Sequence, residues 1–355
     1  MPHALQILAG PAAAALLRER GLHANDVDVV VGASGGPKWL VLAGLDRAIF
    51  GEFLAVPRER PLHLIGSSVG SWRMACLAQQ DAVAAIARFE EAYIAQCYSP
   101  HPSAAEVSRM GEKILEELLG ERGAREILEH PCARLHVITA RSRGLVRSER
   151  KAVQMAGLAL AAIGNAISRR SLRHQFERVI FETSGERGPF RNLVDLPTRH
   201  VPLTHANLRP ALMASGSIPL VLEGVKIPGA PRGVYRDGGV IDYHPDFDFG
   251  SDNGLVLYPH FYPHVVPGWF DKSLSWRKAG ARNFDRVLML APAPEFVAGL
   301  PGGRIPDRKD FYRYDDAQRM RIWQDVCDAG KRLGDEFREL VVSGRWEERI
   351  QPVAG

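Results

Sequence analysis

The stretch "LHLIGSSVGSWRMACLAQQ" (residues 62–80) joins a short apolar run to a segment with the apolar spacing of a helix. Its centre, Gly66-Ser67-Ser68-Val69-Gly70, is a G-x-S-x-G motif. A strand followed by this motif and a helix is typical of a nucleophile elbow, a sharp turn that exposes the middle serine. Glycine at both ends lets neighbouring backbone approach closely, and the N-terminus of the helix brings partial positive charge near the serine. The stretch therefore predicts a strand–turn–helix unit with Ser68 at its tip.

A serine hydroxyl is a weak nucleophile and needs a base. Downstream, "YRDGGVIDYH" (residues 235–244) puts Asp237 at the end of a short expected strand, and the two glycines that follow leave its carboxylate little shielded. Histidines occur further along, at positions 244, 260 and 264. The chain order Ser, Asp, His is that of α/β-hydrolase triads. The order of residues alone therefore permits either a Ser-His-Asp triad or a direct pair of Ser68 and Asp237.

A second glycine-rich turn lies upstream in "VVVGASGGPKWL" (residues 29–40), where an apolar strand runs into a glycine turn. Its backbone N–H groups could hold a nucleotide phosphate or the oxyanion of an ester reaction. A phosphate loop of the form G-x-x-x-x-G-K-[ST] needs a donor where Pro37 stands and a hydroxyl where Trp39 stands. The glycines are also wrongly spaced for a dinucleotide site. The turn therefore favours an oxyanion, and a nucleotide-binding enzyme is the lesser alternative.

Apolar runs and helical segments alternate along the chain. Strands are expected at residues 27–31, 62–66, 134–141, 178–183, 233–239, 254–261 and 286–292. Helices are expected at residues 11–20, 39–54 and 68–80, over most of 81–130, from 208 to near 219, and at 315–342. This alternation predicts an α/β layered fold with a largely parallel sheet. Because no repeat or low-complexity linker divides the chain, we expect one domain over residues 1–355, with the motifs in 27–245 and residues 246–355 completing it.

Composition limits the kinds of partner. Hydrophobic residues make up 46% of the 355 residues and charged residues 24%, as in an ordinary folded protein, and a net charge of +4 is too small to indicate nucleic acid. The four cysteines form no C-x-x-C pair, which favours reduced thiols in a cytoplasmic protein over a disulfide framework or a zinc site. The first residues lack the features of a signal peptide. The sequence carries no signal for the oligomeric state.

Four motifs in this order resemble those of the patatin-like acylhydrolases, the patatin-like phospholipase family. They are Gly35-Gly36-Pro37-Lys38, Gly66-Ser67-Ser68-Val69-Gly70, Ala214-Ser215-Gly216-Ser217-Ile218-Pro219 and Asp237-Gly238-Gly239, and the resemblance spans residues 27–245. It implies a three-layer α/β/α fold with a central, mostly parallel sheet. It also implies a serine acylhydrolase that cleaves lipid carboxylic esters through an acyl-enzyme, with no cofactor and no metal.

The same resemblance implies roles for single residues. Ser68 would be the nucleophile and Asp237 its base, in a dyad without histidine. Backbone N–H groups at Gly35 and Gly36 would hold the oxyanion, and Lys38 would steady that loop or attract an anionic substrate. The glycines at 66 and 70 would shape the nucleophile elbow. The implied partner is a lipid or other acyl-ester substrate, and peripheral contact with a membrane is compatible with it.

Three further features have competing interpretations. The segment "DYHPDFD" (residues 242–248) resembles a set of metal ligands but lacks their spacing and a remote partner, so a solvated loop is expected. His63 is expected to be a packed side chain rather than a base. The apolar run 153–167 has basic residues on both sides and is too short to span a bilayer. It indicates either a buried helix or a cap that meets acyl chains or a membrane face. A lipid-binding protein without turnover is a last alternative.

Overall fold

A ten-stranded sheet runs through the computed structural model, which describes residues 3–183, 188–251 and 254–353. Its strands are β1 (Leu5–Ala9), β2 (Val27–Gly32), β3 (Leu62–Ser67), β4 (Ala133–Ser142), β5 (Phe176–Glu182), β6 (Thr198–Pro202), β7 (Tyr235–Asp237), β8 (Leu255–Pro259), β9 (Val287–Pro292) and β10 (Ile350–Pro352). Their order is β10-β1-β9-β8-β2-β3-β4-β5-β6, and β7 pairs with β4 beside this path. Within the described ranges the antiparallel pairs are β1–β9, β4–β5 and β4–β7. The expected α/β class with a largely parallel sheet is confirmed.

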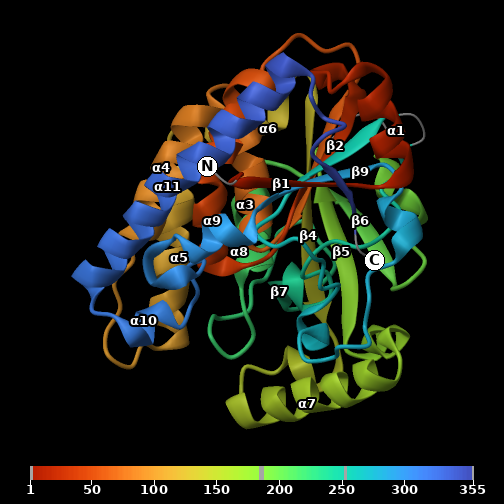
Figure 1. The fold of residues 1–355 in the computed structure, drawn as a ribbon. Coiled ribbons are helices and arrows are strands. Elements are labelled where there is room, and N and C mark those ends of the chain that lie inside the picture. Colours follow the sequence, from red (N-terminus) through yellow and green to blue (C-terminus); the bar gives the residue numbers. More distant parts are fainter. Residues whose placement is uncertain (1–2, 184–187, 252–253, 354–355) are drawn as a thin grey trace.

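Helices cover the sheet on both sides. The α-helices are α1 (Pro11–Arg20), α2 (Ala43–Ala48), α3 (Val69–Leu77), α4 (Ala82–Ile94), α5 (Ala104–Leu119), α6 (Gly123–Glu129), α7 (Lys151–Ile167), α8 (Leu208–Gly216), α9 (Pro294–Ala298), α10 (Asp310–Arg313) and α11 (Asp316–Ser343). Figure 1 shows α4, α5 and α11 together on one side of the sheet and α1 on the other, with α7 apart from them at the bottom of the view. This is the expected three-layer α/β/α arrangement.

Short helices fill many of the connections. They are η1 (Ala24–Asp26), η2 (Gly36–Leu42), η3 (Ile49–Phe53), η4 (Gly144–Arg147), η5 (Arg169–His174), η6 (Pro189–Asn192), η7 (Gly238–Val240), η8 (Trp269–Asp271), η9 (Ala281–Phe284) and η10 (Pro301–Gly303). The single helix expected over residues 39–54 is wrong, because the chain runs through the 3-10 helix η2, then α2, then the π-helical η3. Every residue of η2 is buried, so packing on all sides replaces the single apolar stripe that marks an ordinary surface helix.

Three strands have no counterpart among the sequence expectations. β6 and β10 lie at the two ends of the strand order, and most of their residues are partly or fully exposed. Edge strands of this kind lack the continuous apolar run that marks a buried strand. β1 is buried, but it is five residues long and stands one residue before the alanine-rich start of α1, which hides its boundary.

The register of the central strands brings the motifs together. β2 and β3 are parallel with Gly32 opposite Gly66, so the turn after β2 and the elbow after β3 emerge side by side. One edge of β4 is paired with β5. Two strands pair with the other edge of β4, one after the other. β3 pairs with its first part, up to Ser67↔Ile138, and β7 pairs with the part that begins at Thr139↔Asp237. The end of β7 therefore meets the end of β3, which places residue 237 beside the elbow.

Three glycines let helix α3 approach the strands. A Cβ on Gly70 would lie 2.2 Å from the carbonyl oxygen of Gly32, and a Cβ on Gly66 would lie 2.6 Å from the carbonyl carbon of Gly70. Side-chain carbons never approach backbone atoms so closely, so only glycine fits at these contacts. The elbow glycines are therefore explained by packing alone.

Alternation along β3 separates the two faces of the sheet. Gly66 faces α3, so His63 faces the other side, where its Nδ1 lies 3.1 Å from Nε2 of His136 and its ring packs edge-on against Phe190. His63 is thus a packed side chain, as expected.

Helix α7 lies on a small core of its own. Leu158 and Ala161 pack in a cluster with Val240 and Ile241, separate from the main core. The opposite face of α7 is exposed, so the interpretation of this segment as a buried helix is wrong for half of its surface. Across the described parts of the chain, no helix is long and apolar enough to cross a membrane.

Candidate active site

Ser68 stands at a strained turn between β3 and α3. Its φ of 54° and ψ of −135° form a combination that residues with a side chain rarely adopt. Two hydroxyl groups hold it there. The Ser68 N–H donates to Oγ of Ser215 (2.8 Å), whose own hydroxyl donates to the carbonyl of Ile138 (2.7 Å), and the Ser71 hydroxyl donates to the Ser68 carbonyl (2.7 Å). This geometry is that of a nucleophile elbow, and it gives Ser215 of the A-S-x-x-x-P segment a structural role.

The Ser68 hydroxyl donates directly to Asp237, with 2.9 Å between Oγ and Oδ2. The other carboxylate oxygen, Oδ1, accepts a hydrogen bond from the Gly239 N–H at 2.7 Å. Burial raises the pKa of Asp237, while the charge of Arg308 and these two hydrogen bonds counteract that rise. The carboxylate is therefore fixed in orientation and more basic than an exposed one. Such a group is suited to accept a proton from the serine.

The three downstream histidines lie elsewhere. Nδ1 of His244 is 2.9 Å from the Val266 backbone nitrogen, and Nδ1 of His260 is 2.9 Å from that of Tyr262. Burial lowers the pKa of both rings, that of His260 to about 3. His264 is exposed and stacks on Tyr262. No histidine of the described residues hydrogen-bonds to Ser68 or Asp237, whereas these two side chains hydrogen-bond directly to each other.

The glycine turn after β2 lies beside the serine. Gly36 has a φ of +57°, which favours glycine, and begins helix η2. The first N–H groups of a helix have no partner within it, so they are available to an acceptor. Lys38 forms an ion pair with Asp307, is almost fully buried, and is not among the described residues that line the cavity at Ser68. Of its two expected roles, this contact corresponds to support of the loop.

A cavity of about 400 Å³ opens at Ser68. Gly36 lies at its wall beside the serine, and the cavity walls come from α3, α4, α5, α10 and the segment after α8. Most of the lining is apolar, including Val69, Trp72, Val107, Ile114, Leu222 and Phe311. A largely apolar cavity with a few polar groups at one end is the usual form of a site for an acyl chain or other organic ligand.

The model of the patatin-like phospholipase family matches residues 40–245, which is more than half of the chain. This protein belongs to the patatin-like phospholipase family. The match includes Ser68 and Asp237 but begins after the glycine turn, so Gly35, Gly36 and Lys38 lie outside it. No curated protein matches the chain. Family membership identifies this patatin-like protein as a hydrolase that acts on lipid esters.

The sequence analysis missed one residue of the patatin-like site. Arg308, in the loop "PDRKD" (residues 306–310), lines the cavity together with Ser68, and its Nε lies 2.9 Å from where a Cβ on Gly36 would stand. Its positive charge counteracts the rise of the Asp237 pKa, and among the described residues its guanidinium makes no hydrogen bond or ion pair. No local motif marks this arginine, because only folding brings residue 308 to residues 36 and 68.

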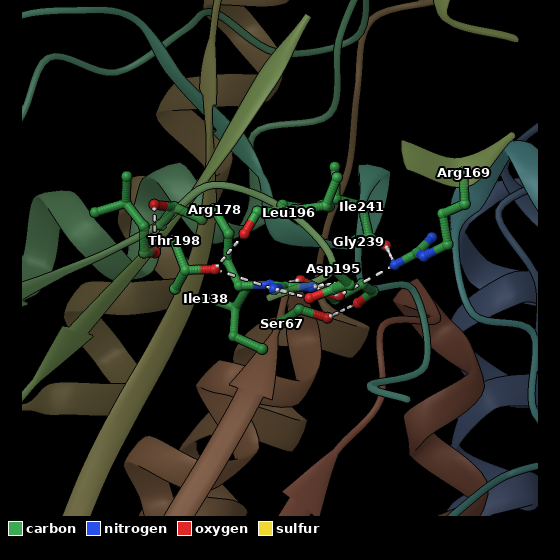
Figure 2. Close-up of polar contacts among 12 residues, drawn as sticks. Ser67, Ile138, Arg169, Arg178, Asp195, Leu196, Thr198, Gly239 and Ile241 are labelled. Atoms are coloured by element: carbon green, nitrogen blue, oxygen red, sulfur yellow. Dashed lines mark hydrogen bonds and ion pairs between the residues drawn. The ribbon is translucent and has the colours of Figure 1, made fainter. Parts of the chain in front are cut away.

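An ion-pair network around the buried Arg178 supports the loop after Asp237 (Figure 2). Nε of Arg178 donates to Asp242 (2.7 Å), and its two terminal nitrogens bind both oxygens of Asp195 (2.7 and 2.8 Å). Burial alone would lower the pKa of Arg178, but the two carboxylates raise it, so the guanidinium stays charged. The Ser67 hydroxyl donates to the Asp242 carbonyl, and Arg169 donates to that of Ile241. The network therefore ties the residue before Ser68 to the loop after Asp237.

This network corrects one expectation. The segment 242–248 is not a solvated loop: Asp242 and His244 are fully buried, and within it Asp248 is exposed. Across the described ranges, no group of three or more histidine, cysteine, aspartate or glutamate side chains is arranged to hold a metal ion. Asp242 instead neutralises the buried Arg178.

Proposed function

We propose that this protein hydrolyses lipid carboxylic esters of the phospholipase A, lysophospholipase or esterase type through a dyad of Ser68 and Asp237. The observation that carries the proposal is the 2.9 Å hydrogen bond from the Ser68 hydroxyl to a buried carboxylate, at the end of an apolar cavity. Asp237 takes the hydroxyl proton as Oγ attacks the ester carbonyl carbon. The protonated Asp237 then gives that proton to the departing alcohol, which leaves an acyl-enzyme on Ser68.

Hydrolysis of the acyl-enzyme repeats the same proton transfers. A water molecule gives a proton to Asp237 and attacks the acyl carbon, and the released proton returns to the Ser68 oxygen as the fatty acid leaves. Gly239 keeps the carboxylate in place through both stages by its hydrogen bond to Oδ1. No cofactor enters the proposal, since the two side chains supply all the proton transfers.

The negative charge of the tetrahedral intermediate is proposed to develop at the glycine turn. Backbone N–H groups at Gly35 and Gly36 are the proposed donors to this oxyanion. Arg308 packs against Gly36 and lines the same cavity as Ser68, so its positive charge is proposed to stabilise the oxyanion as well. Fixed positive charge aimed at a developing oxyanion is among the largest contributions to enzyme catalysis.

The acyl chain is proposed to lie in the apolar cavity. Trp72 and Ile114 are among the side chains that would contact it, and both come from helices that cover the sheet beside Ser68. Activity against p-nitrophenyl esters of increasing chain length, measured beside phospholipids and lysophospholipids, would define the preferred chain and the head group.

Labelling by a fluorophosphonate tests the proposed nucleophile. The parent protein is expected to be labelled at Ser68, and Ser68→Ala is expected to lose both the label and ester hydrolysis. Ser99→Ala is the matched control, because Ser99 lines the same cavity but its hydroxyl donates to Glu106. Folded parent protein that resists the probe and hydrolyses no ester contradicts the proposal.

A further inference from the structure

The exposed face of α7 is apolar from residue 152 to residue 167. The helix buries Gln154, Gly157, Leu158, Ala161 and Asn165. The opposite face exposes 56% of Met155, 53% of Leu160, 63% of Ile163 and 84% of Ile167, with alanines between them. No charged residue occurs between Lys151 and Arg169. An exposed helix face normally carries polar and charged side chains, so this face requires an apolar partner.

Both ends of α7 carry exposed positive charge. Arg147, Arg150 and Lys151 precede or begin the helix, and Arg170 and Arg173 follow it. All five side chains are exposed and none forms an ion pair with a described residue. The one carboxylate in the preceding segment, Glu149, is paired with Arg236. The apolar face is therefore bordered by cations that form no ion pair with any residue that the structure describes.

We propose that α7 docks this patatin-like protein on an anionic lipid surface, with the helix lying in the plane of the interface. Apolar side chains on one face with basic residues at its borders are the pattern of interfacial helices, because the first enter the acyl region while the second contact anionic head groups. Trp276 extends the surface: its side chain is 64% exposed, and the next residue, Arg277, donates to the carbonyl of Asn165 on α7. Tryptophan favours the boundary between lipid and water.

The proposed docking surface is joined to the mouth of the cavity. Oε1 of Gln154 accepts a hydrogen bond from the Leu220 N–H at 2.8 Å, and residues 218, 221 and 222 around it line the cavity. Val221 is itself 45% exposed. On its inner face, α7 packs against Val240 and Ile241, shortly after Asp237. Docking would thus bring lipid to the entrance of the site, a consequence that rests on the proposed function.

Binding to vesicles tests the surface. The parent protein is expected to sediment with phosphatidylcholine vesicles that contain about 30 mol% phosphatidylserine, and to bind pure phosphatidylcholine at least about tenfold more weakly. Raising the salt from about 0.1 M to about 0.5 M should weaken binding to the anionic vesicles, because it screens the flanking cations. The double variant Leu160→Asp/Ile163→Asp is expected to lose vesicle binding. Val342→Asp is the matched control, since Val342 on α11 is 88% exposed and far along the chain from α7.

Charge variants provide a second measurement that leaves the apolar face intact. Arg150→Gln and Arg170→Gln are each expected to weaken binding to the anionic vesicles about fivefold. Every variant should hydrolyse the soluble ester p-nitrophenyl butyrate as the parent does, which shows that it is folded. Equal vesicle binding by the parent, the double variant and the charge variants would overturn the proposal.

The docking surface and the proposed chemistry fail in different ways. Ser68→Ala should bind vesicles as the parent does. A parent that hydrolyses p-nitrophenyl butyrate but ignores anionic vesicles overturns the docking surface and leaves the dyad standing. A parent that binds anionic vesicles but hydrolyses no ester overturns the dyad and leaves the docking surface standing. A parent that is dimeric in sedimentation velocity, becomes monomeric in the double variant and binds no vesicle identifies a second copy of this chain as the occupant instead, which also overturns the proposal.

Discussion

Replacing Asp237 by asparagine removes the proposed base and little else. The amide oxygen can accept the hydrogen bond that the Gly239 N–H gives to Oδ1, and the amide nitrogen stands where Oδ2 receives the Ser68 hydroxyl. Shape and burial are retained, while the ability to take a proton is lost. Because burial disfavours the charged carboxylate and raises its pKa, removing that charge should not lower the free energy of unfolding.

The expected effect on catalysis is large. A positioned general base contributes about 10²–10⁴ in rate, or about 3–5 kcal/mol in activation free energy. Asp237→Asn should therefore lower kcat/KM for p-nitrophenyl butyrate by about 10²–10⁴ at pH 7. The loss should appear mainly in kcat, because the carboxylate contacts the serine and not the apolar walls that bind the acyl chain.

Asp246→Asn is the matched control for this measurement. Burial raises the pKa of Asp246 too, but its carboxylate contacts Asn283 and Gly280 and not Ser68. Its variant should keep kcat/KM within about threefold of the parent. Thermal unfolding of all three proteins checks that each is folded. Asp237→Asn that is folded and keeps more than about a tenth of the parent kcat/KM would refute the role of Asp237 as base.

Three other predictions follow from the same geometry. Because burial raises the pKa of Asp237 above its ordinary value and the reaction needs the carboxylate, kcat/KM of the parent should fall as the pH drops through that raised pKa. A pH–rate profile with no acidic limb above about pH 4 contradicts this. Gly70→Ala puts a Cβ 2.2 Å from the Gly32 oxygen and should lower the free energy of unfolding by about 1–3 kcal/mol. Urea denaturation measures this loss of stability, with Gly299→Ala as the control, because a Cβ on Gly299 would lie 3.4 Å from its nearest neighbour, the Phe296 carbonyl oxygen. Equal stability of the two variants rejects the packing argument. Arg308→Gln should lower kcat/KM for an uncharged ester about 10- to 100-fold, and an effect confined to anionic esters would assign this charge to the substrate instead.

The ion-pair network of Arg178, Asp195 and Asp242 contributes both to the stability of the fold and to the position of the proposed base. Arg178 and Asp242 are fully buried next to the loop that follows Asp237, and the second carboxylate on Arg178, that of Asp195, is partly exposed. Removing Arg178 or Asp242 would leave a buried charge without its main partner, which costs about 3–5 kcal/mol. The network therefore fixes the position of residues 237–242, and part of the precision of the candidate site comes from side chains that touch no substrate.

The amino-acid sequence determined the parts of this protein that depend on neighbouring residues. A sharp strand-to-helix turn needs small residues at fixed offsets, so Gly66 and Gly70 marked Ser68 before any fold was known. The alternation of apolar runs with helical spacing predicted the α/β class, because burial of a parallel sheet on both faces leaves continuous apolar runs. The edge strands β6 and β10 escaped this reasoning because their exposure removes that signal.

Only the tertiary structure decided which of the possible partners meet. Ser68 and Asp237 are 169 residues apart, and Lys38 and Asp307 are 269 apart. Contact over such distances depends on strand register and burial, which no local pattern records, so the histidines at 244 and 260 could not be excluded from sequence. The sequence also could not place Arg308 at the cavity. Nor could it show that apolar residues of α7 are exposed, because their pattern is also that of a buried helix. Neighbouring residues determine the local backbone geometry, whereas burial and charge pairing depend on contacts between distant parts of the folded chain.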